Sequence, residues 1–188
     1  MRRLIVGISG ASGALYGVRI LEVLRAIPDI ETHLVLTDVG KFNIKFETER
    51  DPEEVMRLAD YVHDIGDLAA PISSGSFKTE GMVIAPCSVK TSSGIANSYS
   101  ANLLLRAADV CLKERRRLVL LFRETPLHLG HLEILQKIAL LGGIILPPTP
   151  GFYHKPKTLD DIVNHSVGKA LDLLGIELDL FPRWEGAN

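Results

Sequence analysis

The sequence predicts an α/β protein, a three-layer sandwich in which one parallel sheet lies between two layers of helices. Short apolar runs alternate along the chain with segments that carry apolar residues at helical spacing. Each apolar run is continuous, which is typical of parallel strands that are covered on both faces. With 188 residues the chain is long enough for one well-buried domain, so we expect residues 1–188 to form a single domain.

The first strand and the first helix flank a turn that is rich in glycine and serine. Residues 4–8 predict a buried strand and residues 14–26 a helix, and the turn between them contains Ser9, Ser12 and two glycines. Glycines let the backbone approach an anion, and the free N–H groups and dipole of a helix start stabilise its charge. The turn therefore predicts a phosphate-binding site. It lacks the dinucleotide pattern G-x-G-x-x-G, and glycine turns also serve packing alone.

The middle of the chain adds two strands and a helix start. Residues 33–37 predict the second strand, and Pro52 after Asp51 predicts a helix start. Asp38 either stands where the ribose-binding acid of a dinucleotide site lies or caps a helix. Residues 69–76 predict a loop, and residues 82–85 a third buried strand that Pro86 stops.

A second hydroxyl-bearing turn, residues 86–91, follows the third strand. Two such turns on one edge suit an elongated ligand with a phosphate at one end and a polar ring at the other. N-capping of the next helix by Ser88 or Thr91 explains the same residues equally well. The sequence offers Cys87 no activating base, so we expect a buried structural thiol rather than a nucleophile.

The last third of the chain continues the alternation of strands and helices. The expected helices are residues 103–114, 129–141 and 159–174, and the expected strands are 118–122 and 144–146. Gly142 and Gly143 end the second of these helices. Arg123 and Glu124 follow a buried strand directly, where a guanidinium can bind phosphate and a carboxylate can move a proton.

These turns are expected to meet at one edge of the sheet. The carboxyl ends of parallel strands lie together, and ligands gather there. The segments concerned are residues 9–13, 37–38, 86–91, 123–124 and 150–154.

Composition and charge narrow the kinds of partner. The net charge of -2 gives no reason to expect nucleic acid or an anionic membrane. No apolar stretch approaches the ~20 residues that span a bilayer. The low cysteine content and the lack of a signal-peptide pattern predict a reduced, cytoplasmic protein. His128-x-x-His131 with Glu133 lacks the spacing of zinc hydrolases, so we expect no metal.

Several long motifs, in this order along the chain, resemble the UbiX-like flavin prenyltransferases. They are SGASGALYG at 9–17, PCSxxTxSxIA at 86–96, RAADVxLKERRxLVL at 106–120, RETP at 123–126, LPPTPGFYHKP at 146–156 and PRW at 182–184. The match covers almost the whole chain and is closest to the branch long described as aromatic-acid decarboxylase subunits.

The resemblance implies a Rossmann-like (flavodoxin-like) flavoprotein domain and a defined chemistry. The family binds FMN, whose reduced form is the acceptor, and joins to its N5 atom a dimethylallyl group from dimethylallyl monophosphate. A second bond, to C6, closes a fourth ring, and no metal is needed. The product passes to a UbiD-like decarboxylase that acts on unsaturated or aromatic acids.

The resemblance also implies roles for individual residues. Those expected to bind FMN are Gly10, Ala11, Ser12, Thr37, Ser88, Val89, Lys90, Thr91 and Arg123. Those expected around the prenyl donor are Arg106, Lys113, Arg123, Tyr153, Lys169 and Trp184. The expected catalytic groups are Glu47, Lys113, Glu124 and Tyr153.

The charges that form in the reaction explain these residue types. Breaking the allylic C–O bond creates a cation and a phosphate dianion, and Lys113, Arg123 and Tyr153 would stabilise the anion without reorganisation. The flavin ring and Trp184 would stabilise the cation. Glu124, Glu47 and the phosphate itself all remain candidates for accepting the proton that ring closure releases.

Two positions depart from the family pattern. Lys169 stands where many members carry arginine, which keeps the positive charge but loses a bidentate grip on phosphate. Leu68 stands where some members have tryptophan, and the segment between residues 48 and 66 is short compared with some relatives. These differences bear on the length of the prenyl chain more than on the type of reaction.

Family members form large homo-oligomers, commonly dodecamers, with sites shared between subunits. Glu47, Arg106 and Lys113 are therefore expected to act on a neighbour's flavin, and the tail from about residue 176 to pack on a neighbouring subunit.

Two other functions stay open. An FMN-dependent decarboxylase acting directly on an aromatic or phenolic acid would need a histidine base beside the flavin, for which His33 and His63 are poorly placed in the sequence pattern. A non-catalytic FMN carrier would bind flavin without changing it.

Overall fold

The computed structural model describes residues 1–186, and its centre is a six-stranded sheet in which every neighbouring pair of strands is parallel. The strands are β1 (Arg2–Ile8), β2 (Ile30–Leu36), β3 (Tyr61–His63), β4 (Gly81–Cys87), β5 (Arg117–Phe122) and β6 (Ile144–Ile145). The helices are α1 (Ala14–Arg25), α2 (Asp38–Thr48), α3 (Pro52–Met56), α4 (Val89–Ala96), α5 (Leu103–Lys113), α6 (Leu129–Leu140) and α7 (Leu159–Leu173), with a short 3₁₀ turn, η1 (Pro71–Ser73).

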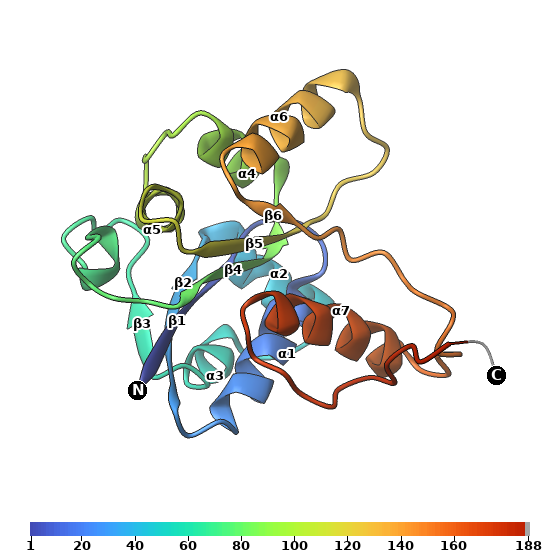
Figure 1. The fold of residues 1–188 in the computed structure, drawn as a ribbon. Helices are drawn as coiled ribbons and strands as arrows, with labels where there is room; N and C mark the ends of the chain where they lie inside the picture. The colour runs from blue at the N-terminus through green and yellow to red at the C-terminus, as the bar shows by residue number, and fades with distance from the viewer. Residues whose placement is uncertain (187–188) are drawn as a thin grey trace.

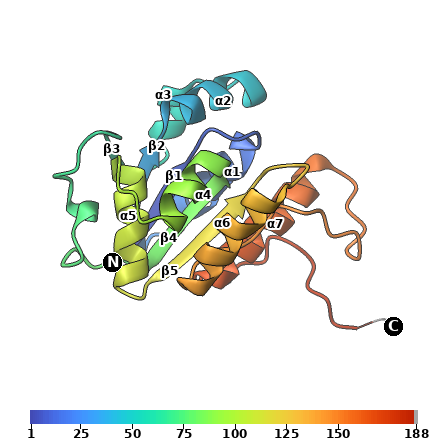
Figure 2. The ribbon, with the colours of Figure 1, turned by 90° about the horizontal axis from the view of Figure 1, so that it is seen from above.

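Helices cover both faces of the sheet (Figure 1). Side chains that alternate along β1 belong to two separate cores: Leu4, Val6 and Ile8 pack with α1 and α7, whereas Ile5 packs with α4 and α5. This division follows from the strand period of two residues, which sends successive side chains to opposite faces. The three-layer sandwich expected from the sequence is confirmed. In Figure 1, α4, α5 and α6 lie above the sheet and α7 lies below it; in Figure 2, seen from above, α4 lies in front of the strands.

The strand order β3-β2-β1-β4-β5-β6 changes direction between β1 and β4. The chain winds one way through β1, β2 and β3 and the other way through β4, β5 and β6. Such a switch point leaves a crevice beyond the carboxyl ends of the two central strands, because the connections on either side turn away from each other. The fold therefore places β1 and β4 beside the expected ligand site.

One predicted strand boundary is corrected, and one strand is added. Pro86 does not stop its strand: β4 continues to Cys87, with a register irregularity between Ile84 and Cys87 where proline has no N–H for the ladder. The chain also has a strand that the sequence did not reveal, β3, which is short, exposed and at the sheet edge. Its three residues are too few to show a periodic pattern.

The remaining predicted elements agree within a few residues. Asp51 caps α3, accepting a hydrogen bond from Glu53 N, with Pro52 in the first turn as expected. The N-cap of α2 is Thr37 rather than Asp38, which is the first helical residue. Gly142 follows α6 with a φ of 97°, the left-handed conformation that favours glycine at a helix end. Within residues 1–186, none of the helices is both long and apolar enough to cross a bilayer.

Candidate functional site

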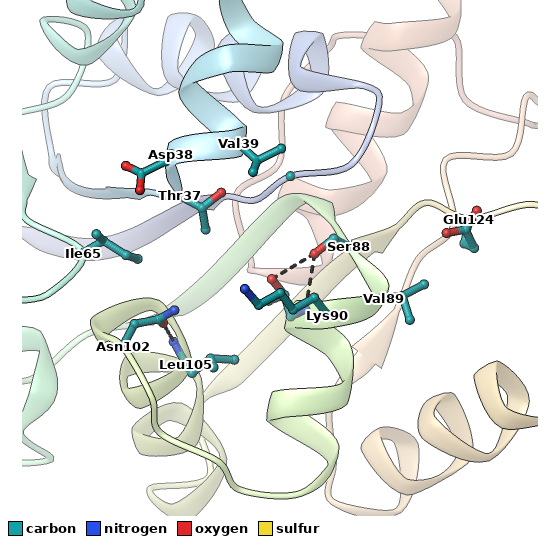
Figure 3. A pocket seen from close by; sticks show the side chains of 12 residues that line it. Thr37, Asp38, Val39, Ile65, Ser88, Val89, Lys90, Asn102, Leu105 and Glu124 are labelled. Atoms are coloured by element: carbon teal, nitrogen blue, oxygen red, sulfur yellow. Dashed lines mark hydrogen bonds between the residues drawn. The ribbon is translucent and has the colours of Figure 1, made fainter.

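A pocket of about 400 Å³ lies at the carboxyl ends of the central strands. It is lined by Gly10, Thr37, Asp38, Val39, Ile65, Ser88, Val89, Lys90, Thr91, Asn102, Leu105 and Glu124. Figure 3 shows the start of α2 facing α4 and α5 across the pocket, with Glu124 beyond Val89. Four of the five predicted turns therefore meet in one pocket, as the parallel sheet requires.

Three of the lining residues are helix N-caps. Thr37 Oγ1 accepts a hydrogen bond from Gly40 N at 3.0 Å, Ser88 Oγ from Thr91 N at 3.2 Å, and Asn102 Oδ1 from Leu105 N at 3.0 Å. The amino ends of α2, α4 and α5 thus converge on one space, each with a partial positive charge. With the ammonium group of Lys90, this arrangement suits an anionic ligand that bears a polar ring.

Ser9 joins the two central turns of the site. Its buried Oγ donates to Pro86 O at 3.0 Å and accepts from Ser88 N at 2.9 Å. The turn after β1 is thereby fixed against the turn after β4. Ser9 therefore has a structural role, because its hydroxyl joins the two turns.

Glu47, from the last turn of α2, reaches the start of α1. Its Oε2 accepts from Gly13 N at 2.8 Å and from Ala14 N at 2.9 Å. Gly13 has no side chain that could cap the helix, so Glu47 performs that role. The expectation that the first N–H groups of α1 are free for a phosphate is corrected. Ala11 O accepts from Asn43 Nδ2, also on α2, and Ser12 is exposed beside it.

Arg123 lies next to the pocket, since its backbone N–H donates to Cys87 O at 3.1 Å. Its exposed side chain faces Tyr16 of α1. Burial raises the pKa of Tyr16, and contacts with Ser166 and with the Arg123 charge partly offset the effect. Tyr16 therefore stays protonated near neutral pH and can act as a hydrogen-bond donor, a role that no local motif indicated.

Tyr153 is not among the residues that line the pocket and lies against α7. Its hydroxyl is 3.0 Å from His165 Nε2, and its ring meets Trp184 edge-on with the centroids 5.8 Å apart. His154 stacks on His165 at 4.8 Å. Lys169 is exposed one turn further along α7. These residues form a second cluster, separate from the lining of the pocket.

Arg106 and Lys113 also lie outside the pocket lining. Arg106 donates to Ser73 O at 3.0 Å and pairs with Asp109, while Lys113 pairs with Glu114. The start of α5, at Asn102 and Leu105, lines the pocket, and Lys113 lies about 16 Å along the helix axis from Asn102.

Cys87 and Cys111 are both buried, and neither forms a disulfide. Burial raises the pKa of both Cys87 and Cys111 to about 12, so both stay protonated at neutral pH. Among the described residues, no group of three or more His, Cys, Asp or Glu side chains is arranged to hold a metal ion.

The lining residues that sequence reasoning missed are Val39, Ile65, Asn102 and Leu105. Asn102 had a usable signal, because asparagine directly before an apolar helical segment is a common N-cap. Ile65 had none, since it follows an edge strand that is itself too short to recognise.

One histidine lies closer to the main pocket than the sequence predicts. His63 lines a smaller pocket that shares Asp38 and Ile65 with the main one.

This chain is similar to known flavoproteins over almost its whole length. The family model described as Flavoprotein matches residues 1–171. A protein of Escherichia coli strain K12 named flavin prenyltransferase UbiX is 59% identical over 189 residues, with 100% of both chains covered.

Two solved structures are similar over almost their whole length. A dodecameric FMN-dependent UbiX-like decarboxylase from Escherichia coli O157:H7 has a TM-score of 0.96 and 48% identity, covering 98% of this chain and 100% of that one. AnUbiX (PadA1), in complex with FMN and dimethylallyl pyrophosphate, has a TM-score of 0.97 and 46% identity, covering 100% of this chain and 99% of that one.

Proposed function

This chain belongs to the Flavoprotein family and, within it, to the UbiX flavin prenyltransferases, and on that premise we propose its reaction. It joins a dimethylallyl group from a dimethylallyl phosphate to reduced FMN and releases phosphate. The observation that carries the proposal is the convergence of three capped helix starts and Lys90 on one pocket at the switch point of the sheet. That donor set fits a flavin nucleotide, which brings both a phosphate and a ring edged with hydrogen-bond acceptors.

The residues around the pocket divide between two tasks. Thr37, Val89, Lys90 and Thr91, with the turn at residues 10–12, hold FMN through backbone N–H groups, hydroxyls and one ammonium, and Ser88 orders the start of α4 beside them. Glu124 lines the pocket directly after β5 and serves as a proton acceptor.

Arg123 binds the donor phosphate. It follows β5 directly, and its exposed side chain can turn toward the pocket. Tyr153, Lys169 and Trp184 form the wall on the α7 side, where the donor phosphate and the allylic cation are stabilised. The donor is the monophosphate in our proposal, and the pyrophosphate in the related complex makes a parallel test necessary.

We further propose that the active protein is a homo-oligomer, a dodecamer like its relative, with shared sites. Lys113 and Arg106 support this proposal, since α5 carries them away from the pocket of their own subunit. In such an assembly they reach the pocket of a neighbour, and the tail from about residue 176 packs on another subunit. The recipient of the product is a UbiD-like decarboxylase, and the reaction takes place in the cytoplasm.

The test is mass spectrometry of the flavin. FMN is chemically reduced without oxygen and incubated with the protein and dimethylallyl monophosphate, in parallel with the pyrophosphate. We expect a mass gain of one C5 prenyl unit, and unchanged FMN with both donors would contradict the proposal. Release of carbon dioxide from an aromatic acid by the protein alone would instead favour a decarboxylase.

Variants separate binding from chemistry and test the shared site. Lys113→Ala should keep FMN affinity within about twofold and lose product. A non-catalytic FMN carrier, by contrast, would form no product even as the wild type.

Oligomers assembled from a mixture of Lys113→Ala and Glu124→Gln subunits should regain activity, because some sites then contain both intact residues. No recovery in mixed oligomers would place Lys113 and Glu124 in the same subunit's site.

A further inference from the structure

The tail that follows α7, residues 175–184, contains neither helix nor strand and runs back along α7 to the loop before that helix (Figure 1). A segment without helical or sheet hydrogen bonds keeps its place only through individual contacts, because its backbone otherwise regains conformational freedom. Ile176, Phe181 and Arg183 supply such contacts. Ile176 is 6% exposed, and its N–H donates to Leu171 O of α7 at 3.0 Å.

Phe181 packs directly on the backbone of α7. It is only 9% exposed, and a Cβ at Gly168 would lie 2.5 Å from its ring. The ring therefore occupies the space that a side chain at residue 168 would need. It also meets the ring of His165 edge-on, with the centroids 4.9 Å apart. The tail is thus fixed on α7 three residues before Trp184.

Arg183 makes two hydrogen bonds to one carboxylate of α7. Its Nη1 donates to Asp172 Oδ2 at 2.8 Å, and its Nη2 donates to Asp172 Oδ1 at 2.9 Å. The Asp172 side chain is only 16% exposed, and the guanidinium carbon of Arg183 lies 5.3 Å from the centroid of the Phe181 ring. Exposed ion pairs usually contribute little, but a bidentate pair fixes the orientation of the guanidinium plane.

Trp184 follows Arg183 directly and lies against Tyr153. The two rings meet edge-on, with the centroids 5.8 Å apart. Trp184 is 61% exposed, so most of its indole surface is open to a ligand and little of it is held by packing. The position of the indole therefore depends on the backbone that Arg183 fixes.

We propose that Arg183 and Asp172 are positioning residues whose bidentate pair holds the Trp184 indole beside Tyr153 of the same subunit. The inference rests on the proposed function, in which Tyr153, Lys169 and Trp184 form the wall on the α7 side. An indole that is in place before the donor binds can stabilise the allylic cation without first being ordered. The inner side of the tail is covered by α7 of its own subunit, and the outer side is left for a neighbour.

The first experiment measures the position of Trp184 without turnover. Trp184 is the only tryptophan of the chain, so 5-fluorotryptophan incorporated into the FMN-bound protein gives one ¹⁹F signal, which reports on residue 184. In the wild type we expect a signal that is well separated from that of the urea-unfolded protein. Arg183→Met and Asp172→Asn should each move the signal toward the unfolded position and narrow it. An unmoved signal in Arg183→Met would overturn the proposal.

Two further variants separate geometry from charge. Arg183→Lys keeps the positive charge but cannot make two parallel hydrogen bonds, so its signal should lie closer to that of Arg183→Met than to the wild type. A lysine variant identical to the wild type would overturn the bidentate role. Arg25→Met is the matched control, because Arg25 is an exposed arginine at the end of α1 that donates to Arg57 O at 2.7 Å. Its signal should equal that of the wild type.

The second experiment measures the single-turnover rate of flavin prenylation at saturating dimethylallyl monophosphate. Arg183→Met should lower this rate about threefold or more, with the FMN affinity within about twofold, because the cation loses an aromatic face. In a Trp184→Leu background the same substitution should change the rate less than 1.5-fold, roughly the error of a double-mutant cycle. A purely structural role for Arg183 would lower the rate equally in both backgrounds and would overturn the proposal.

The outcomes distinguish this inference from the proposed function. A wild type that forms no prenylated FMN would overturn the proposed function, while the ¹⁹F signal still shows whether Arg183 positions Trp184. An active wild type with an equally active Arg183→Met variant would overturn the positioning role alone. A displaced ¹⁹F signal, together with a rate effect that disappears in the Trp184→Leu background, would support it.

Discussion

Hydrogen-bond direction decides the function of several single residues in this protein. Ser88 Oγ accepts from Thr91 N and donates to Thr91 Oγ1, so its proton is already used within α4. The hydroxyl proton of Thr91 is then the one left for a ligand. The sequence offers capping and ligand binding as alternatives for Ser88 and Thr91; Ser88 performs the capping, which leaves the Thr91 hydroxyl proton for the ligand that we propose.

The same reasoning gives a prediction for Tyr153. A phosphate dianion only accepts, so the Tyr153 hydroxyl can serve the donor phosphate only by donating to it. Its oxygen must then accept from His165 Nε2, 3.0 Å away. His165→Leu removes that partner and should raise the KM for dimethylallyl monophosphate about tenfold, the equivalent of one hydrogen bond of about 1.4 kcal/mol.

His165→Gln is the control for this prediction. Its side-chain amide can still donate, so the KM should stay within about threefold of the wild type, and the FMN affinity of both variants should be unchanged. Equal KM values for the leucine and glutamine variants would show that His165 does not orient Tyr153.

At the scale of secondary-structure elements, one glycine sets how closely a helix lies on the sheet. A Cβ at Gly17 of α1 would lie 2.2 Å from Ala85 O of β4 and 2.7 Å from Ile8 Cγ1. Both neighbours are buried parts of the two central strands. The position of α1, and with it the turn at residues 9–13, therefore depends on the absence of a side chain at residue 17.

We predict that Gly17→Ala destabilises the protein by several kcal/mol. Alanine is favoured over glycine in a helix by about 1 kcal/mol. The contact of 2.2 Å between the new Cβ and the Ala85 backbone oxygen costs more, because β4 cannot move away without breaking hydrogen bonds between strands. Urea unfolding measures the difference.

Gly130→Ala in α6 is the matched change. There a Cβ would meet only the exposed ring of His128, at 3.0 Å, and that ring can turn away. The stability of this variant should lie within about 1 kcal/mol of the wild type. A Gly17→Ala protein as stable as Gly130→Ala would show that α1 can move away from the sheet at little cost.

At the scale of the whole molecule, α2 presents an apolar stripe to the outside. Val39, Phe42 and Phe46 are 55%, 62% and 75% exposed, and the two phenylalanine rings stack on each other. Exposed aromatic side chains at helical spacing are typical of a surface that another chain covers. Because Val39 also lines the flavin pocket, a second copy bound to this stripe would lie at the edge of the site.

Phe46→Glu should therefore shift the protein toward smaller species in sedimentation velocity, because a buried unpaired carboxylate opposes association. Phe152→Glu, an equally exposed phenylalanine at 71% exposure in the loop before α7, tests whether any exposed ring has this effect. An unchanged sedimentation coefficient for Phe46→Glu would place the subunit contact elsewhere.

Stability should decrease between pH 7 and pH 5. Burial lowers the pKa of His33, His63 and His165 in the folded protein. The unfolded chain binds protons at these positions near pH 6.5 while the folded chain does not, so protonation favours unfolding as the pH falls. Carboxylates whose pKa is lowered, such as Glu31, lose their contribution only below about pH 4.5.

The urea midpoint measured across this range checks the prediction, and His33→Phe should show a shallower decrease because one buried histidine is gone. A flat stability between pH 7 and pH 5 would mean that the three histidines are protonated equally easily in the folded and unfolded chains.

The sequence by itself determined the order of the elements and the segments that form the site. Continuous apolar runs indicated the buried parallel strands, and a parallel sheet places the ends of those strands at one edge, so the turns at Gly10, Thr37, Ser88 and Glu124 were predictable together. The long family motifs indicated the chemistry. These features are local in the chain, or follow from the topology alone.

Only the tertiary structure decided how the polar groups pair. The hydrogen bonds of Ser9 to β4, of Glu47 to the start of α1 and of His33 to His63 join residues that are 30 or more positions apart. No periodicity or motif records such a pairing, because it depends on the register of strands and on helix packing. The same packing places Lys113 outside the lining of the main pocket in its own subunit. It places His63 in the lining of the smaller, neighbouring pocket. Which polar groups form hydrogen bonds depends on their distance in space. A sequence pattern contains only the spacing of residues along the chain, so it cannot predict these pairs.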